Sequence, residues 1–335
     1  MNSRFERCLA DADSAARELR TLRDLLRYAV SRFESAGLAY GHGTDNAWDE
    51  AVALLLWALH LPPEALDPWL DARLVRAERR AAVELIERRV ASRVPAAYLT
   101  GEAWLRGLSF ACDARALVPR SPIAEALDEA LPQWLEHHPR ASPWPSAILD
   151  LCTGGASLAI VAADRFPGAH LVGADLSADA LALAAQNRTR HGLEQRLELV
   201  QGDLFAPVRR RRFDLVLCNP PYVNETSMRQ LPPEFQAEPR AALAGGADGM
   251  DLVRRLLAQA PAHLTGEALL LIEIGHEAAH FEAAFPALEF HYLPVAAGEQ
   301  MLVLIEARQL AAAARRRASG PASRSAAKRP RARRP

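Results

Sequence analysis

The tetrapeptide Asn219-Pro220-Pro221-Tyr222 has the residue types needed to hold a planar nitrogen group for a transfer reaction. The side-chain carbonyl of Asn219 is a neutral hydrogen-bond acceptor, and the carbonyl of Pro220 is a second one, fixed by two consecutive restricted φ angles. Two such acceptors can take both N–H groups of a primary amide and aim its nitrogen, while Tyr222 offers a flat face. Because an amide nitrogen is a poor nucleophile, alignment is the main catalytic resource, and it can contribute ~7–11 kcal/mol.

A second group of residues has the pattern of a turn that cradles a nucleotide-type cofactor. Small residues let the backbone approach a ligand, and the helix that follows offers free N–H groups. An ordinary tight turn explains the glycines equally well. In a cofactor site, this turn would hold the methionine end of S-adenosylmethionine, with the aspartate near its amino group. The residues concerned are Asp150, Cys152, Thr153, Gly154, Gly155 and Ala156.

Two further acidic residues have the spacing of cofactor contacts. Asp175 lies 25 residues after Asp150, and an acidic residue about 20 residues downstream holds the ribose diol in Rossmann-like sites. Asp203, followed by Leu204, could accept a hydrogen bond from an adenine amine. The alternatives are a helix cap at Asp175, for which Ser177 is better suited, and a simple turn at Asp203.

These motifs all come at the ends of predicted strands. Strands alternating with helices predict an α/β fold with a doubly wound, mostly parallel sheet, which binds ligands at the carboxyl ends of its strands. The predicted strands cover 147–151, 170–174, 197–201, 213–218, 268–274 and 301–306, and the predicted helices cover 123–135, 157–165, 178–191 and 248–263.

The remaining segments predict a smaller helical domain, a linker and a tail. Apolar spacing in residues 1–106 indicates helices, with His42 in a turn between two glycines and Asp45 as a helix cap. Residues 107–122 have the pattern of a hairpin linker. Residues 308–335 hold ten Lys and Arg but no acidic residue, and we expect this basic tail to be disordered.

Composition and charge limit the functional classes. Outside the tail, 30 basic residues face 41 acidic ones, a formal charge of −11, which argues against a nucleic-acid footprint over the whole surface. The four cysteines have no metal-ligand or redox spacing and predict a reduced, cytoplasmic protein. Met1 to Arg20 lacks a signal-peptide pattern, and no apolar run approaches the ~20 residues of a membrane span.

In this order, the four motifs resemble the class I Asn-Pro-Pro-Tyr amino-methyltransferases, and within that group the protein N(5)-glutamine methyltransferases. One branch of this family modifies release factors, and the other modifies the third large-subunit ribosomal protein. The stretch Val118-Pro119-Arg120-Ser121-Pro122-Ile123 is similar to the signature of the ribosomal branch, whereas the release-factor branch has Pro-Arg-Pro-Glu/Asp-Thr there. Residues 25–33, 40–51 and 95–100 also look like the leader domain of the ribosomal branch.

The resemblance implies a Rossmann-like class I methyltransferase domain at 123–307, with S-adenosyl-L-methionine as cofactor and no metal. It implies that Cys152–Ala156, Asp175, Asp203 and Leu204 contact the cofactor, with Asn219 shared between cofactor and substrate. The substrate amide would be held by Asn219, Pro220, Pro221 and Tyr222, and the protein substrate would be recognised by the leader domain. The chain departs from the family at Ala156, where a second glycine is usual.

Three other functions compete with this interpretation. A nucleic-acid amino-methyltransferase uses the same tetrapeptide, but flipping a base would need a basic face. A release-factor methyltransferase is disfavoured by Ser121-Pro122. A non-catalytic assembly factor is supported only by Ala156. For the run Arg209–Arg212 we expect a solvated loop, with contact with ribosomal RNA as the alternative. For Glu273 we expect a structural role, and for the basic tail a weak contact with RNA.

Overall fold

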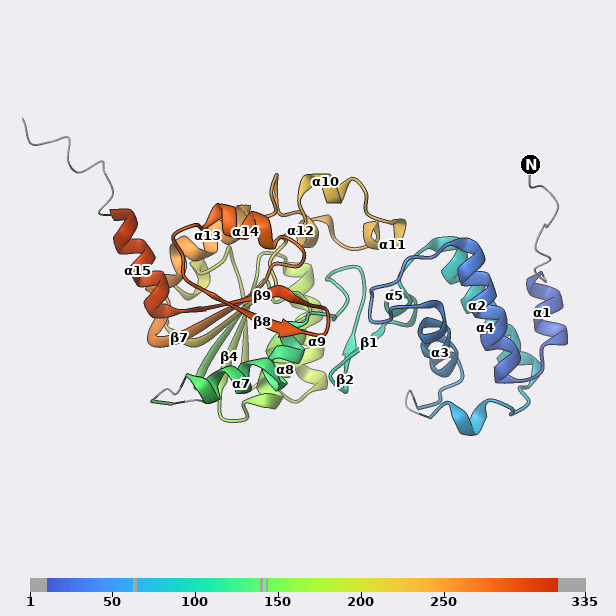
Figure 1. Cartoon of the computed structure of the whole chain (residues 1–335). Coiled ribbons are helices and arrows are strands. Elements are labelled where there is room, and N and C mark those ends of the chain that lie inside the picture. The colour runs from blue at the N-terminus through green and yellow to red at the C-terminus, as the bar shows by residue number, and fades with distance from the viewer. Residues whose placement is uncertain (1–10, 63–64, 139–140, 143, 319–335) are drawn as a thin grey trace, which may run out of the picture.

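The computed structural model describes residues 11–62, 65–138, 141–142 and 144–318, which form a helical domain beside an α/β sheet domain (Figure 1). The sheet has seven strands in the order β5-β4-β3-β6-β7-β9-β8. β3 to β7 run parallel, β9 runs antiparallel to β7, and β8 runs antiparallel to β9. This confirms the predicted doubly wound sheet. The strands are β3 (Ala147–Leu151), β4 (His170–Asp175), β5 (Leu197–Gln201), β6 (Phe213–Cys218), β7 (Leu264–Glu273), β8 (His291–Val295) and β9 (Gly298–Glu306).

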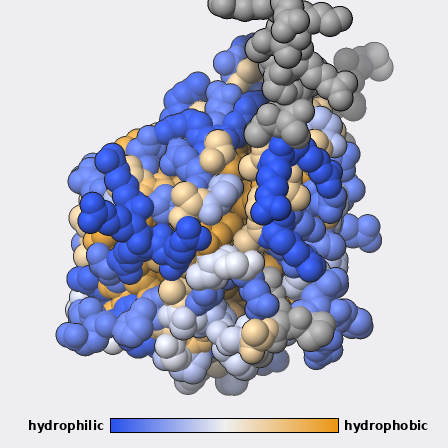
Figure 2. Space-filling view, turned by 90° about the vertical axis from the view of Figure 1, so that its left-hand side faces the viewer, coloured by the Kyte–Doolittle hydropathy of each residue, from blue (hydrophilic) through white to orange (hydrophobic). Residues whose placement is uncertain are grey.

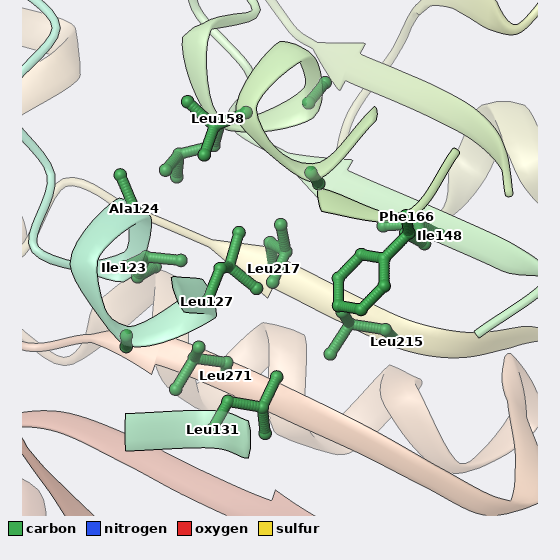
Figure 3. Packing of buried hydrophobic residues seen from close by; sticks show 14 of the residues in the cluster. Ile123, Ala124, Leu127, Leu131, Ile148, Leu158, Phe166, Leu215, Leu217 and Leu271 are labelled. Carbon is green, nitrogen blue, oxygen red and sulfur yellow. The ribbon is translucent and has the colours of Figure 1, made fainter. Parts of the chain in front are cut away.

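Helices cover both faces of the sheet because its central strands are apolar on both sides. On one face, Leu127 and Leu131 pack towards Leu215 and Leu217 of β6, with Leu158 beside them (Figure 3). A second buried cluster fills the other face. The covering helices are α6 (Ile123–Asp128), α7 (Ala130–His137), α8 (Ser157–Arg165), α9 (Ala178–Arg190), α13 (Asp251–Gln259) and α14 (Ala278–Ala284), with short 3₁₀ turns η2 (Ala206–Val208) and η3 (Ala260–Ala262).

Two predicted helices were wrong in extent and one strand was missed, each near a proline. The single helix predicted at 123–135 is broken at Glu129, three residues before Pro132, because proline clashes with the preceding turn. The helix predicted at 248–263 ends at Gln259, before Pro261. Strand β8 was missed because it contains Pro294, which is tolerated at this sheet edge with a shift in register.

The helical domain has its own core, formed by α1 to α4 and closed by α5. Its α3 helix is capped by Asn46, whose side chain accepts from the N–H of Asp49 at 2.9 Å, rather than by the predicted Asp45. The helices are α1 (Ala12–Glu18), α2 (Leu22–Ala36), α3 (Ala47–Ala58), α4 (Arg76–Ser92) and α5 (Ala96–Thr100), with a 3₁₀ turn η1 (Asp67–Trp69).

A hairpin connects the two domains, earlier in the chain than predicted. β1 (Glu102–Leu105) pairs with β2 (Leu108–Ala111), so the hairpin straddles the predicted boundary at residue 107. Arg106 and Gly107 form its two-residue turn with φ of 51° and 77°, as a type I′ turn requires. Residues 116–118, which belong to the predicted hairpin linker, are irregular chain.

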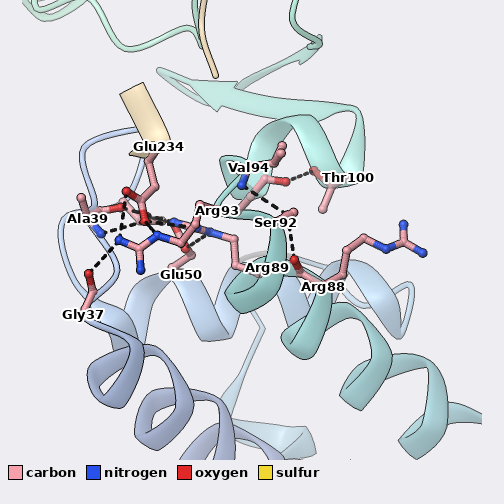
Figure 4. Close-up of polar contacts among 12 residues, drawn as sticks. Gly37, Ala39, Glu50, Arg88, Arg89, Ser92, Arg93, Val94, Thr100 and Glu234 are labelled. Carbon is pink, nitrogen blue, oxygen red and sulfur yellow. Dashed lines mark hydrogen bonds and ion pairs between the residues drawn. The ribbon is translucent and has the colours of Figure 1, made fainter. Parts of the chain in front are cut away.

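A second connection runs from the sheet domain back to the helical domain. Residues 223–246, here called the strap, contain the short helices α10 (Glu225–Met228), α11 (Pro233–Gln236) and α12 (Arg240–Leu243). In Figure 1 the strap reaches from the sheet to the helical domain, and Figure 4 shows Glu234 of α11 among residues of that domain. The carboxylate of Glu234 accepts from the N–H of Ala39 at 3.1 Å and lies 2.9 Å from Nε of Arg93.

The predicted disordered tail begins with a helix. α15 (Ala307–Ala318) includes residues 308–318, because Ala and Arg are strong helix formers and Leu310 is buried in the sheet-domain core. Residues 319–335, on which most of the predicted RNA contact falls, lie outside the described residues. The end of the molecule that carries α15 is mostly hydrophilic (Figure 2), and no helix in the described part is long and apolar enough to cross a membrane.

Candidate active site

A cavity of about 560 Å³ opens at the carboxyl ends of β3, β4, β5 and β6. It lies at the point where the strand order reverses. The chain continues from β3 to β4 and β5 on one side, and then returns to β6 on the other side of β3. The topology therefore brings four segments that are far apart in sequence to one place. The predicted site residues that line the cavity are Cys152, Thr153, Gly154, Gly155, Asp175, Asp203, Leu204, Asn219 and Pro221.

The turn after β3 is strained. Cys152, Gly154 and Ala156 have φ of 58°, 55° and 63°, and the left-handed region costs a non-glycine residue about 1–2 kcal/mol. Ala156 thus occupies a position that favours glycine. It is fully buried in the core and does not line the cavity, so its methyl group faces the protein interior.

Asp150 lies beneath this turn and does not line the cavity. Its Oδ2 accepts from Thr153 Oγ1 at 2.5 Å and from the N–H of Ala159 at 3.1 Å, which fixes the turn to the start of α8. Its Oδ1 is buried and has no hydrogen-bond partner within the described structure. Burial raises the pKa of Asp150 to about 7.

Asp175 ties the ends of β4 and β3 together. One carboxylate oxygen accepts from the N–H of Gly154 at 2.9 Å, and the other from the N–H of Ser177 at 2.8 Å. Ser177 caps α9, as expected. The next residue, Leu176, lines the cavity although 69% of it is exposed, and sequence reasoning missed this apolar wall.

The cavity wall beyond Asp175 is formed by Asp203 and Leu204. The carboxylate of Asp203 pairs with Arg255 of α13, which also lines the cavity. Leu204 has a φ of 49° and is almost fully buried. Strained residues gather at functional sites because the surrounding fold must hold them there, and Leu204 and Cys152 both border this cavity.

The Asn219–Tyr222 segment follows β6 directly. Asn219 and Pro221 line the cavity, whereas Pro220 is buried and neither Pro220 nor Tyr222 lines the cavity. A Cβ atom at Gly275 would lie 2.4 Å from the Tyr222 ring, and one at Gly249 would lie 2.1 Å from the Tyr222 carbonyl oxygen. These glycines allow the close packing that fixes the tetrapeptide.

Two polar residues beside this segment have partners that the sequence did not reveal. Glu273 is buried at the end of β7 and accepts from Tyr222 at 2.8 Å and from Ser121 at 2.5 Å. Arg120 lines the cavity and donates to both oxygens of Glu238 at 2.6 Å. A carboxylate directly after the apolar run Ala268–Ile272 was the available signal for Glu273, since burying it requires partners.

Two other predicted features make contacts that the sequence did not reveal. His42, expected in a simple turn, is buried between the domains, with its Nε2 atom 3.4 Å from Glu238. The arginine run is an exposed loop, as predicted. Within it, Arg211 pairs with Glu198 at 2.5 Å and Arg212 donates to the carbonyl of Leu264 at 2.8 Å.

The sheet order, the antiparallel strand β9 and the cavity define a class I methyltransferase. The Methyltransferase small domain model matches residues 124–247, and the PrmC N-terminal domain model matches residues 24–101. The ribosomal protein uL3 glutamine methyltransferase of Bordetella pertussis is 55% identical over 293 residues, which cover 88% of this chain and 97% of the relative. Those of Burkholderia pseudomallei and Xanthomonas campestris pv. campestris are 50% and 44% identical, with 88% and 89% of this chain and 97% and 95% of the relatives covered. The chain belongs to the family of ribosomal protein uL3 glutamine methyltransferases.

Proposed function

We propose that this protein transfers a methyl group from S-adenosylmethionine to the side-chain amide nitrogen of a glutamine in ribosomal protein uL3. The names of its relatives support the reaction and the substrate. The observation that carries the proposal is the joining of Asn219 and the turn Cys152–Gly155 in one cavity. A volume of about 560 Å³ lies within the ~300–1,000 Å³ range of sites for cofactors.

The cavity fits the proposed cofactor. Gly154 has left-handed backbone, and a Cβ there would reach 3.6 Å from Ala116 across the cavity, so a side chain would narrow the space. Asp175 has carboxylate lone pairs for a ribose diol, and Leu176 and Leu204 form an apolar slot beside Asp203 for an adenine ring. When bound, S-adenosylmethionine supplies an electrophilic methyl group.

The end of the cavity at Asn219 and Pro221, here called the acceptor end, would align the amide of the substrate. The side-chain carbonyl of Asn219 and the main-chain carbonyl of Pro220 accept the two N–H groups of the glutamine and direct the nitrogen lone pair at the methyl carbon. The aligned nitrogen would take the methyl group that the cofactor supplies, and the methylated amide would give its extra proton to water. Alignment of this kind lowers the barrier without a strong base.

We also propose that the helical domain recognises the protein substrate and that the sheet domain binds the cofactor. Support comes from the strap, which borders the cavity at Pro239 and Gly245 and contacts the helical domain at Glu234. A protein substrate that reached the acceptor end would therefore lie close to both domains.

Mass spectrometry of uL3 incubated with the enzyme and S-adenosylmethionine tests the function. We expect one added methyl group on a glutamine with the wild type and none with Asn219→Ala. Calorimetric titration of the cofactor into the variant checks that its cavity is intact. A methyl group found instead on a release factor or on RNA would overturn the substrate assignment.

A further inference from the structure

Arg120 lies at the acceptor end of the cavity. It lines the cavity, and its neighbour Ser121 donates to Glu273, the residue that anchors Tyr222. Both terminal nitrogens of Arg120 donate to Glu238 at 2.6 Å. The guanidinium carbon also lies 5.6 Å from the centre of the Phe235 ring.

Glu238 is held from both domains of the protein. Its side chain is fully buried, it accepts from the N–H of Val118 at 3.1 Å, and it lies 3.4 Å from Nε2 of His42 in the helical domain. Burial acts to raise the pKa of Glu238, but the interactions with His42 and Arg120 outweigh it and hold that pKa at about 2. At neutral pH, Glu238 is therefore an ionised, fixed partner for Arg120.

The turn Gly41-His42-Gly43 closes this arrangement from the helical domain. Gly41 has a φ of 112°, and a Cβ atom there would lie 3.2 Å from the Phe235 ring. The rings of His42 and Phe235 are 4.3 Å apart between centres. The glycine thus permits a close approach that places His42 against both Phe235 and Glu238 of the strap region.

The donors of Arg120 are only partly used. A guanidinium carries five N–H groups, and the hydrogen bonds found among the described residues use those that point to Glu238. Because Glu238 already neutralises the charge, the pair is poorly suited to an anion and well suited to a neutral acceptor. At the entry of a protein substrate, the abundant neutral acceptors are main-chain carbonyl groups.

We propose that Arg120 donates hydrogen bonds to main-chain carbonyl oxygens of the substrate polypeptide beside the methyl-accepting glutamine. Glu238 and His42 are positioning residues that hold Arg120 in the required orientation. This inference rests on the proposed function and deepens it, since it assigns a substrate contact to a residue of the linker and links that contact to the helical domain.

Steady-state methylation of uL3 by three variants of the full chain tests the proposal. Arg120→Lys keeps the charge but loses the planar fork of donors, and Glu238→Gln keeps the shape of the partner but loses its charge. We expect both to raise the KM for uL3 roughly 10-fold or more, as for the loss of a hydrogen bond to a charged group. The Kd for S-adenosylmethionine should stay within about twofold, because the proposed contact involves substrate alone.

Glu234→Gln is the matched control. Glu234 lies in the same strap and is as buried as Glu238, but it faces Arg89 and Arg93 and does not line the cavity. This variant should lose thermal stability with little change in KM. An unchanged KM in Arg120→Lys, or losses in all three variants that simply follow their Tm, would overturn the inference. Failure of the wild type to methylate uL3 would instead overturn the proposed function.

Discussion

The hydroxyl group of Tyr222 donates a 2.8 Å hydrogen bond to Oε1 of Glu273. The other oxygen of Glu273 accepts from Ser121 at 2.5 Å, so one buried carboxylate joins the loop after β6, the end of β7 and the linker from the helical domain. Burial raises the pKa of Glu273 despite these bonds. The acceptor end of the cavity is thus fixed by a polar contact inside an otherwise apolar core.

Tyr222→Phe should weaken both the fold and the reaction. It leaves Oε1 of Glu273 buried without a donor, which costs about 1–3 kcal/mol of unfolding free energy. Because the ring is no longer fixed, we expect slower methyl transfer at an unchanged cofactor affinity. Denaturant unfolding and single-turnover methylation measure the two effects. Tyr292→Phe is the control, since its hydroxyl bonds the exposed Glu282 at 3.0 Å; equal losses in both variants would contradict the argument.

Gly154→Ala should reduce cofactor affinity. Gly154 has a φ of +55° and lines the cavity, whereas Gly37 has a φ of +58° at the end of α2 with no atom within 4 Å of an added Cβ. Alanine should therefore cost about 1 kcal/mol of stability at either position. Only Gly154→Ala should raise the Kd for S-adenosylmethionine in calorimetric titration. Equal cofactor affinity in the two variants would exclude Gly154 from the binding turn.

The pKa of Asp150 predicts how stability depends on pH. Because that pKa is raised from 3.8 to about 7 by burial, the folded protein binds more protons than the unfolded chain between these values. The free energy of unfolding attributable to Asp150 should therefore fall as pH rises from about 4 to 7. Asp150→Asn removes this loss, so its stability relative to wild type should increase over that range in urea titrations.

Asp214→Asn is a control for which the opposite pH dependence of stability is expected. Although burial acts to raise the pKa of Asp214, hydrogen bonds from Ser146 and Ala147 lower it below the ordinary value. Its contribution is present above the ordinary pKa of 3.8 and is lost as pH falls below it. The wild type should exceed Asp214→Asn most clearly at neutral pH, and parallel trends in the two variants would refute the assignment.

Glu234→Ala should destabilise the contact between the domains. Arg89 and Glu234 have fully buried side chains, and Arg93 is mostly buried, so the variant leaves buried cations short of a partner, at a cost of about 3–5 kcal/mol. Asp71→Ala removes a surface ion pair with Arg23 and should leave stability unchanged. Denaturant unfolding measures the stability of both variants. A small loss of stability in Glu234→Ala would contradict the prediction, because it would mean that water can solvate Arg89 and Arg93.

The sequence by itself determined the sheet and the location of its ligand site. Apolar strands such as Phe213–Cys218 and the segments after them are local patterns, and the carboxyl ends of parallel strands must meet at one edge. The expected positions of Asp175, Asp203 and Asn219 at one cavity followed from this rule. Prolines obscured some limits of helices and strands, because the effect of a proline depends on where it lies in the folded structure.

Only the tertiary structure decided which charges face one another. Arg120 pairs with Glu238, and the main-chain N–H of Ala39 donates to the carboxylate of Glu234 across 195 positions of sequence. Neither contact has a periodic signal in the sequence. It also placed Asp150 below the cavity instead of in its wall, and packed Leu310 so that the start of the basic tail became a helix. Local patterns specify strands and turns through backbone geometry, whereas the partners of buried polar groups are set by how separate segments pack in three dimensions.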